Sequence, residues 1–272
     1  MPSTTPTPSE CKMRSLLPSR SMKFAIAILI GLGIFFRFAN LDLKFFWGDE
    51  VLTALRVSGY TEAKVVEQSY NGDILNLEDL QRYQFPSEGS SLSDTIAALS
   101  KTPEHPPLYF LLARFWMQVW MPIFGNSVAV LRSLSAIIGL AVFPCIYGLC
   151  LELFGSKTVA WIAMAIVAVS PLHVLYAQEA RSYSLWTVTI LLSSFLLLRS
   201  LRLQKTDEKE SRIRQHWIGY TIATILGLYS HLLFLPVAIG QGIYVFAIER
   251  CRFTKVVSNY LKSAAIAIVA FS

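Results

Sequence analysis

Two adjacent carboxylates, Asp49 and Glu50, follow the aromatic residues 45–47 and precede an amphipathic run. A carboxylate beside a reacting hydroxyl can accept its proton, so the pair contains a candidate general base. Acidic residues at a helix start also stabilise its free N–H groups and its dipole, and this second interpretation stays open. The aromatic residues predict that the segment lies at a membrane interface.

Two histidines lie beside expected helix ends. His105 precedes Pro106 and Pro107, which suit a first helical turn, so free backbone N–H groups and an imidazole are expected together. Such an arrangement can receive a phosphate, although a plain helix start is equally consistent. His231 ends the sequence Tyr-Ser-His after another apolar run. By itself it is more typical of a helix-end histidine with a satisfied hydrogen bond than of a ligand-binding group.

A carboxylate and a guanidinium follow Pro171, which is expected to break the preceding helix. Glu179 and Arg181, with Tyr183 next to them, would lie at the membrane surface, where ionisable groups are often functional. An interfacial ion pair without a catalytic part explains them as well.

Two further arginines, Arg37 and Arg132, lie within one or two turns of expected outer helix ends. Their side chains can extend to the interface as anchors, or hold an anionic headgroup.

Composition predicts the elements that position these residues. The 272 residues are 54% hydrophobic and 15% charged, against roughly 25% charged in soluble domains. The apolar residues form runs near the length of a bilayer crossing. This excludes a soluble globule and predicts an all-α, polytopic transmembrane helix bundle. The net charge of +6 bears on orientation, and no nucleic-acid partner is expected.

Charge then predicts the topology. Residues 1–21 are expected to form a disordered, basic, cytoplasmic tail, and residues 22–39 the first span. Residues 40–104 hold eleven acidic against five basic residues and suit the non-cytoplasmic side. If residues 106–124 also crossed, the basic loop 199–216 would lie outside, against the positive-inside rule. We therefore expect 106–124 to lie at the interface, within an outer loop 40–126 that contains amphipathic juxtamembrane helices.

The remaining apolar runs alternate across the membrane. They are expected at 127–151, 158–177, 183–198, 217–232 and 236–249, with a last run from residue 263. That last run has about half the length of a crossing, so the transmembrane domain 22–272 is expected to be incomplete at its C-terminus. In this topology the unusual polar residues all gather at the outer face.

Five motifs then give the chain a resemblance to a known family. They are FFWGDEVLTALRVSG, EHPPLYFLLARFW, FGNSVAVLRSLSAIIGL, SPLHVLYAQEARSYSLW and GLYSHLLFLPV. The chain resembles the GT-C fold glycosyltransferases of the protein mannosyltransferase and aminoarabinose transferase type. The resemblance implies transfer of a sugar from a polyprenyl-phosphate carrier to a lipid, glycan or protein acceptor. The family's catalytic acidic pair matches Asp49 and Glu50, whereas Ser182 replaces an acid of the next outer loop.

From these residues and the resemblance we expect Asp49 to be the general base and Glu50 to position the acceptor or share the charge. His105, Arg132, Glu179, Arg181, Tyr183 and His231 are expected to bind substrate. A divalent cation, Mg²⁺ or Mn²⁺, would suit these carboxylates, but the resembled families differ in metal use, so no metal ligand is assigned. A non-catalytic membrane scaffold or remnant is the alternative, and a lipid flippase or transporter is less favoured because ionisable residues at mid-membrane are lacking.

Overall fold

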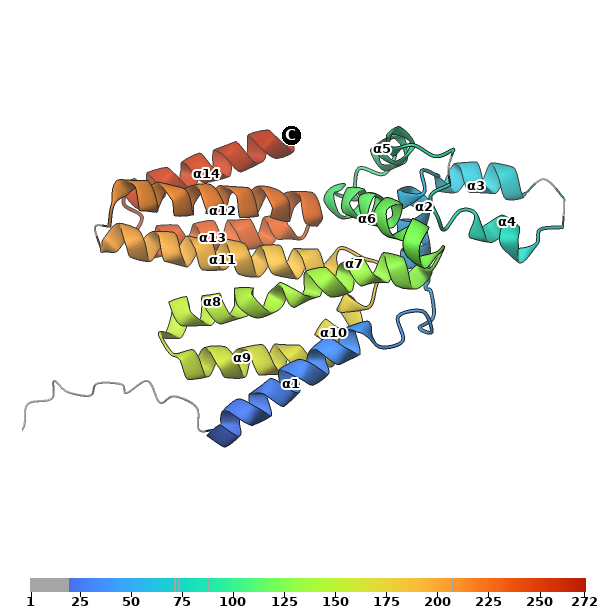
Figure 1. Cartoon of the computed structure of the whole chain (residues 1–272). Helices are drawn as coiled ribbons and strands as arrows, with labels where there is room; N and C mark the ends of the chain where they lie inside the picture. Colours follow the sequence, from blue (N-terminus) through green and yellow to red (C-terminus); the bar gives the residue numbers. More distant parts are fainter. Residues whose placement is uncertain (1–19, 71, 73, 88, 207) are drawn as a thin grey trace, which may run out of the picture.

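In the computed structural model, the described residues are 20–70, 72, 74–87, 89–206 and 208–272. All regular elements among them are α-helices, and Figure 1 shows two groups. The long helices lie side by side as a bundle, and shorter helices gather at one end of it. The prediction of an all-α helix bundle is confirmed. The tail predicted over 1–21 lies outside the described residues up to position 19, and Arg20 and Ser21 begin the first helix.

Among the described residues, nine helices make up the bundle. They are α1 (Arg20–Phe38), α7 (Val128–Leu140), α8 (Val142–Phe154), α9 (Lys157–Val169), α10 (Pro171–Ala177), α11 (Tyr183–Lys205), α12 (Glu210–Ser230), α13 (Phe234–Ile248) and α14 (Lys255–Phe271). Five more lie at its end: α2 (Gly48–Val57), α3 (Glu62–Ser69), α4 (Leu77–Gln81), α5 (Leu92–Ser100) and α6 (Leu108–Phe124). Helix α6 lies near α2 and α5 at this end of the bundle (Figure 1) and packs on α7.

Length and composition identify the helices that can cross a membrane. Three described segments meet both requirements: Arg20–Phe38, which is α1, Val128–Phe154, which joins α7 and α8, and Tyr183–Lys205, which is α11. The pair α9 and α10 makes a fourth if it is counted as one span, with a bend of 62° at its break. Large apolar side chains such as Phe24, Ile166 and Ile243 are exposed on these and neighbouring helices, as expected of surfaces that face lipid.

One predicted connection is wrong. Residues 199–216 were expected to form a cytoplasmic loop, but α11 continues to Lys205 and α12 begins at Glu210. Arg, Leu, Gln and Lys are good helix formers, so both helices extend beyond their apolar segments. The last helix also begins earlier than its apolar run, at Lys255 instead of residue 263.

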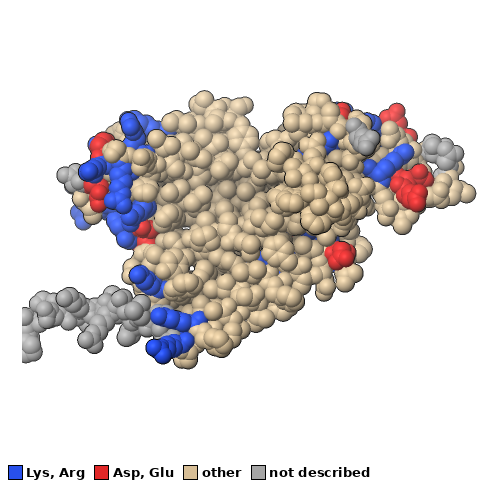
Figure 2. Space-filling model, viewed as in Figure 1, with Lys and Arg blue, Asp and Glu red and all other residues tan. Residues whose placement is uncertain are grey.

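Charged side chains divide the surface of the bundle. Figure 2 shows Lys and Arg gathered where α11 meets α12 and α13 meets α14, with further basic residues near the start of α1 and the α8–α9 turn. Some are paired there: Glu152 binds both Arg199 and Arg202, and Glu210 binds Lys255. In this view most of the surface between the two ends carries no charged residue. A charge-free band between two charged ends is typical of a membrane protein.

The break between α9 and α10 is stabilised by a buried arginine. Pro171 has no N–H to give to the carbonyl of Val167, one turn earlier. Arg37 of α1 donates to that carbonyl at 3.2 Å and to the carbonyl of Ala168 at 2.8 Å. Its side chain is buried, so Arg37 is neither an interfacial anchor nor a headgroup ligand. It satisfies backbone groups that a bent span would otherwise leave without partners.

Close packing of α1 on α9 depends on Gly33. A Cβ atom at this position would collide with the backbone carbonyl of Ala168, whereas one at Gly31 would meet nothing within 4 Å.

We expect Gly33→Ala to lower the free energy of unfolding by about 1–3 kcal/mol through overpacking. Gly31→Ala, the matched control, is expected to be neutral or slightly stabilising. Thermal unfolding of the purified protein in detergent measures both, and equal midpoints would contradict this packing.

Candidate active site

A buried ion pair joins α2, in the segment between α1 and α7, to the bundle. Glu50 of α2 and Arg132 of α7 both have fully buried side chains. Arg132 Nε donates to Glu50 Oε1 at 2.8 Å, and Nη2 donates to Oε2 at 2.7 Å. This two-pronged geometry is the strongest form of the arginine–carboxylate interaction. It fixes the start of α2 on α7.

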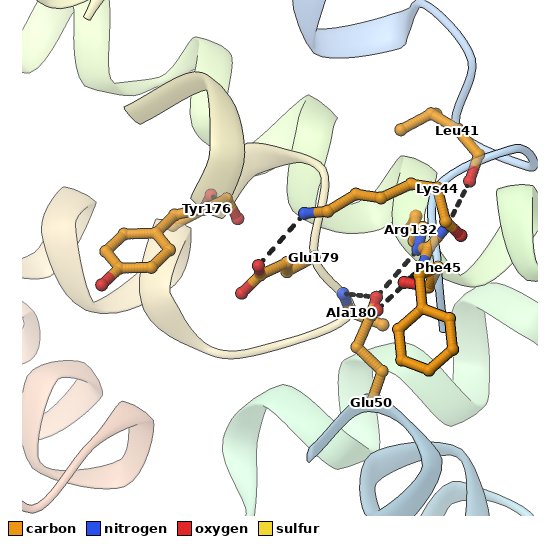
Figure 3. Close-up of polar contacts among 9 residues, drawn as sticks. Leu41, Lys44, Phe45, Glu50, Arg132, Tyr176, Glu179 and Ala180 are labelled. Carbon is orange, nitrogen blue, oxygen red and sulfur yellow. Dashed lines mark hydrogen bonds and ion pairs between the residues drawn. The ribbon is translucent and has the colours of Figure 1, made fainter. Parts of the chain in front are cut away.

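Arg132 also holds the connection between α1 and α2. Its remaining N–H groups donate to the carbonyls of Leu41 at 2.6 Å, Lys44 at 2.9 Å and Phe45 at 3.0 Å. A guanidinium has five N–H donors, and all five are used here (Figure 3). Arg132 therefore has no donor left for a substrate phosphate, so we assign it to support of the loop and not to substrate binding.

A turn between α10 and α11 closes the other side of this cluster. The N–H of Ala180 donates to Glu50 Oε1 at 2.8 Å. Lys44 Nζ lies 3.1 Å from Glu179 Oε1, and the Glu179 side chain is only 8% exposed. Both carboxylates thus face protein groups and not solvent (Figure 3). Glu179, expected to bind substrate, is committed to Lys44 in this structure.

Asp49 differs from its neighbour because successive residues of a helix point about 100° apart. Its side chain is 38% exposed, and its Oδ2 lies 3.6 Å from Nη2 of Arg181. Arg181 Nη1 also donates to the hydroxyl of Thr53 at 3.2 Å. Neither acid caps α2, since Trp47 is the N-cap and no side chain bonds to it. A cap hydrogen bond therefore does not explain the acidic pair, although both acids lie in the first turn of α2, where the helix dipole favours them.

His105 lies near the same charges. Burial lowers its pKa, and the positive charges of Arg56 and Arg181 lower it further, while Glu104 and Asp49 act in the opposite direction. A lowered pKa favours the neutral imidazole at neutral pH, which can donate one hydrogen bond and accept another. His105 precedes α6, so the start of this helix lies in the same region as Asp49.

Aromatic side chains surround His231, directly after α12. Its ring stacks on Trp186 with centroids 4.7 Å apart, and Tyr183 lies 6.4 Å away. His231 Nδ1 accepts a hydrogen bond from the N–H of Leu233 at 3.1 Å. This is the hydrogen-bonded helix-end histidine that the sequence predicts, and its Nε2 takes no part in this bond. Arg181 is near enough for its positive charge to act on His231, and His105 lies in the same region. The starts of α2, α6 and α11 and the end of α12 therefore meet at one site.

The sequence interpretation did not identify three members of this site. Arg56, one helical turn after Thr53, is 4% exposed and donates to Glu62 at 3.1 Å. Trp186 supports His231, and Thr53 binds Arg181. Helical spacing from Asp49 was the signal that could have revealed both α2 residues, because positions four and seven later share its face.

The residues weighed as metal ligands do not converge. Asp49 pairs with Arg181 and Glu179 with Lys44, on different sides of the turn at Ala180. Among the described residues, no three His, Cys, Asp or Glu side chains lie close enough to share an ion.

These observations define a helical membrane protein with a polar site at one end of its bundle. The family model of the dolichyl-phosphate-mannose-protein mannosyltransferases matches residues 104–272, and the chain belongs to this family. The resemblance to the protein mannosyltransferase type and the expected GT-C membrane fold are confirmed. Membership implies a membrane glycosyltransferase that uses a lipid-linked sugar.

The matched range contains the His105, Arg132 and Arg181 regions but not the acidic pair at 49 and 50. No curated protein and no solved structure matches the chain significantly. The role of the acidic pair is therefore argued from its geometry.

Because Glu50 is buried with Arg132 and Glu62 is exposed, we expect a Glu→Gln substitution to lower the free energy of unfolding more at Glu50 than at Glu62. Glu50→Gln leaves the charge of Arg132 buried without its counter-ion, and such a loss costs about 3–5 kcal/mol. Glu62→Gln removes the 59% exposed partner of Arg56, where an ion pair contributes about 0–1 kcal/mol. Unfolding free energies of both variants measure the difference. Equal losses would show that Glu50 does not anchor the loop.

Proposed function

We propose that the protein transfers a sugar from a polyprenyl-phosphate carrier to an acceptor hydroxyl or amine at the non-cytoplasmic membrane face. The observation that carries this proposal is the contrast within the acidic pair. Glu50 is fully buried and held by Arg132, whereas Asp49 is partly exposed beside Arg181. A fixed backbone thus presents one partly exposed carboxylate at the end of a membrane bundle, where a lipid carrier brings its polar headgroup.

In the proposed reaction, Asp49 accepts the proton of the acceptor group as its oxygen or nitrogen attacks the anomeric carbon of the sugar. The bond from that carbon to the phosphate oxygen breaks, and its electron pair leaves with the phosphate. A single displacement inverts the anomeric configuration. Glu50 acts on the reaction only by holding the start of α2, because its oxygens have no exposed surface.

The leaving phosphate needs positive charge more than a proton. Arg181 lies beside Asp49 with its side chain 13% exposed, and the start of α6 at His105 faces the same region. A guanidinium and free N–H groups of a helix start both favour an anion. We assign these two groups to the phosphate, and the ring surfaces of Tyr183 and His231 to the sugar.

We further propose that the basic end of the bundle is cytoplasmic. It contains the α11–α12 and α13–α14 connections with Lys205, Lys209, Arg250 and Arg252. Short loops rich in Lys and Arg stay on the cytoplasmic side. The site at Asp49 lies at the opposite end, which would place it on the outer face and the N-terminus inside (Figures 1 and 2).

The general-base role predicts a large loss in Asp49→Asn, which keeps the shape and removes the proton acceptor. We expect transfer from prenyl-linked sugars in membranes to fall by about 10²–10⁴-fold, with normal protein levels. Glu67→Gln is the matched control, since Glu67 is exposed on α3, away from the site, and is expected to keep full activity. Undiminished transfer by Asp49→Asn would eliminate Asp49 as the base.

The proposed orientation is testable with an existing residue. Cys251 is exposed between α13 and α14, whereas Cys145 and Cys150 lie within α8. In a Cys11→Ser background, a membrane-impermeant maleimide is expected to label Cys251 only after the membrane is permeabilised. A Glu67→Cys variant that lacks Cys251 is expected to react in intact membranes. The reverse pattern would invert the assigned faces.

A further inference from the structure

A second polar groove lies in the outer loop, apart from the residues around Asp49. It encloses about 550 Å³ between α4 with its following turn and the start of α7. Glu78 and Gln81 come from α4, Gln84 and Phe85 from the turn, and Asn126 from the residues before α7. Asp42, from the connection between α1 and α2, completes one wall.

Arg82 and Ser127 of this groove are used within the protein, since Arg82 donates to Tyr83 and Ser127 accepts the N–H of Ala129, but four other polar side chains are not. The side chains of Asp42, Gln81, Gln84 and Asn126 make no hydrogen bond with any other residue in the part of the chain that the structure describes. Each amide offers two N–H donors and a carbonyl acceptor, and each carboxylate accepts at both oxygens. The groove therefore presents several unpaired donors and acceptors beside the ring of Phe85.

A buried arginine fixes the far wall of the groove. Arg114 of α6 is 1% exposed and donates to the backbone and hydroxyl oxygens of Ser90 and to the carbonyl of Val57. A second cavity, lined by Arg114 and Gln118, shares Pro86, Ser87 and Asn126 with the first. The segment around Ser87 thus separates two connected hollows and is tied to α2, so the groove is formed without a ligand.

The lining selects among ligand classes. Asp42 and Glu78 disfavour an anionic ligand, because Arg82 is the one basic residue that lines the groove. An apolar chain would bury the amides without partners, which is costly. A neutral carbohydrate fits both conditions, since its hydroxyls donate and accept in pairs and its C–H face can pack on Phe85.

We propose that this groove binds a neutral oligosaccharide, the non-reacting part of a glycan acceptor. The identification of this oligosaccharide as part of the acceptor rests on the proposed function, whereas the binding of an oligosaccharide to the groove does not. The groove also shares its support with the site. Asp42 lies between Leu41 and Lys44, whose carbonyls Arg132 holds, and Val128 lies one turn before Arg132 on α7. The same guanidinium positions Glu50, so one residue supports both regions.

Binding is tested on the full chain in lipid nanodiscs by saturation-transfer NMR and titration. The probes are neutral oligosaccharides built from glucose, mannose, galactose or N-acetylglucosamine. We expect at least one to bind, and the double variant Gln81→Ala/Asn126→Ala to weaken it at least tenfold, since two sets of hydrogen bonds are lost. Ser87→Trp, which fills the cavity without removing these amides, is expected to abolish the same binding.

Two controls separate this proposal from the proposed function. Asp49→Asn is expected to bind the oligosaccharide normally even though transfer is lost, and Gln215→Ala, on α12 at the opposite end of the bundle, is expected to bind normally. Absence of binding by every probe would overturn the proposal. So would unchanged binding in both groove variants, or binding of a Ser- and Thr-rich peptide at the groove in place of the sugars.

Discussion

The end of the bundle that carries Asp49 depends on the five hydrogen bonds of Arg132. A fully buried guanidinium is expensive to desolvate unless every donor has a partner, and here one carboxylate and three carbonyls supply all of them. The partners come from α2 and from the connection that precedes it. A bundle helix thereby fixes the start of α2, while a hydrophobic cluster that includes Ala54, Tyr109 and Leu131 packs the same segment against α7.

A related arrangement occurs inside the bundle. Arg37 supplies donors to the carbonyls that Pro171 leaves free, so the span can bend by 62° without orphaned backbone groups. The bend precedes the short turn that contains Glu179, Ala180 and Arg181. Two buried arginines on different helices thus act on the two sides of the same turn, one through the backbone before it and one through Glu50 beside it.

Sequence reasoning predicted the architecture well, because hydrophobic runs and loop charges depend on the bilayer more than on tertiary detail. It brought Asp49 and Arg181 to one end, whereas its placement of 106–124 at the membrane interface stays a prediction. It did not distinguish exposed from buried polar groups. Arg132, Glu179 and Glu50 were expected to face substrate, yet each is paired within the protein. Pairing of this kind depends on contacts 82 to 135 residues apart in the chain, which spacing along one helix does not reveal.

The loop predicted at 199–216 was wrong for a different reason. Charge was taken as a sign of irregular structure, although Arg and Lys extend helices readily once the apolar segment has formed them. Arg56 was missed because its charge was counted with the loop and not placed on the face of α2 that carries Asp49.

The different surroundings of Asp49 and Glu50 also constrain the order of these two residues in the sequence. Glutamate is longer than aspartate by one methylene, and Glu50 uses its full length to reach both Arg132 and the Ala180 N–H. Exchanging the two residues would leave the shorter side chain facing inward, too far from its partners, and the longer one swinging freely outside. The anchor of α2 would then be lost, although the composition and the net charge of the chain would be unaltered.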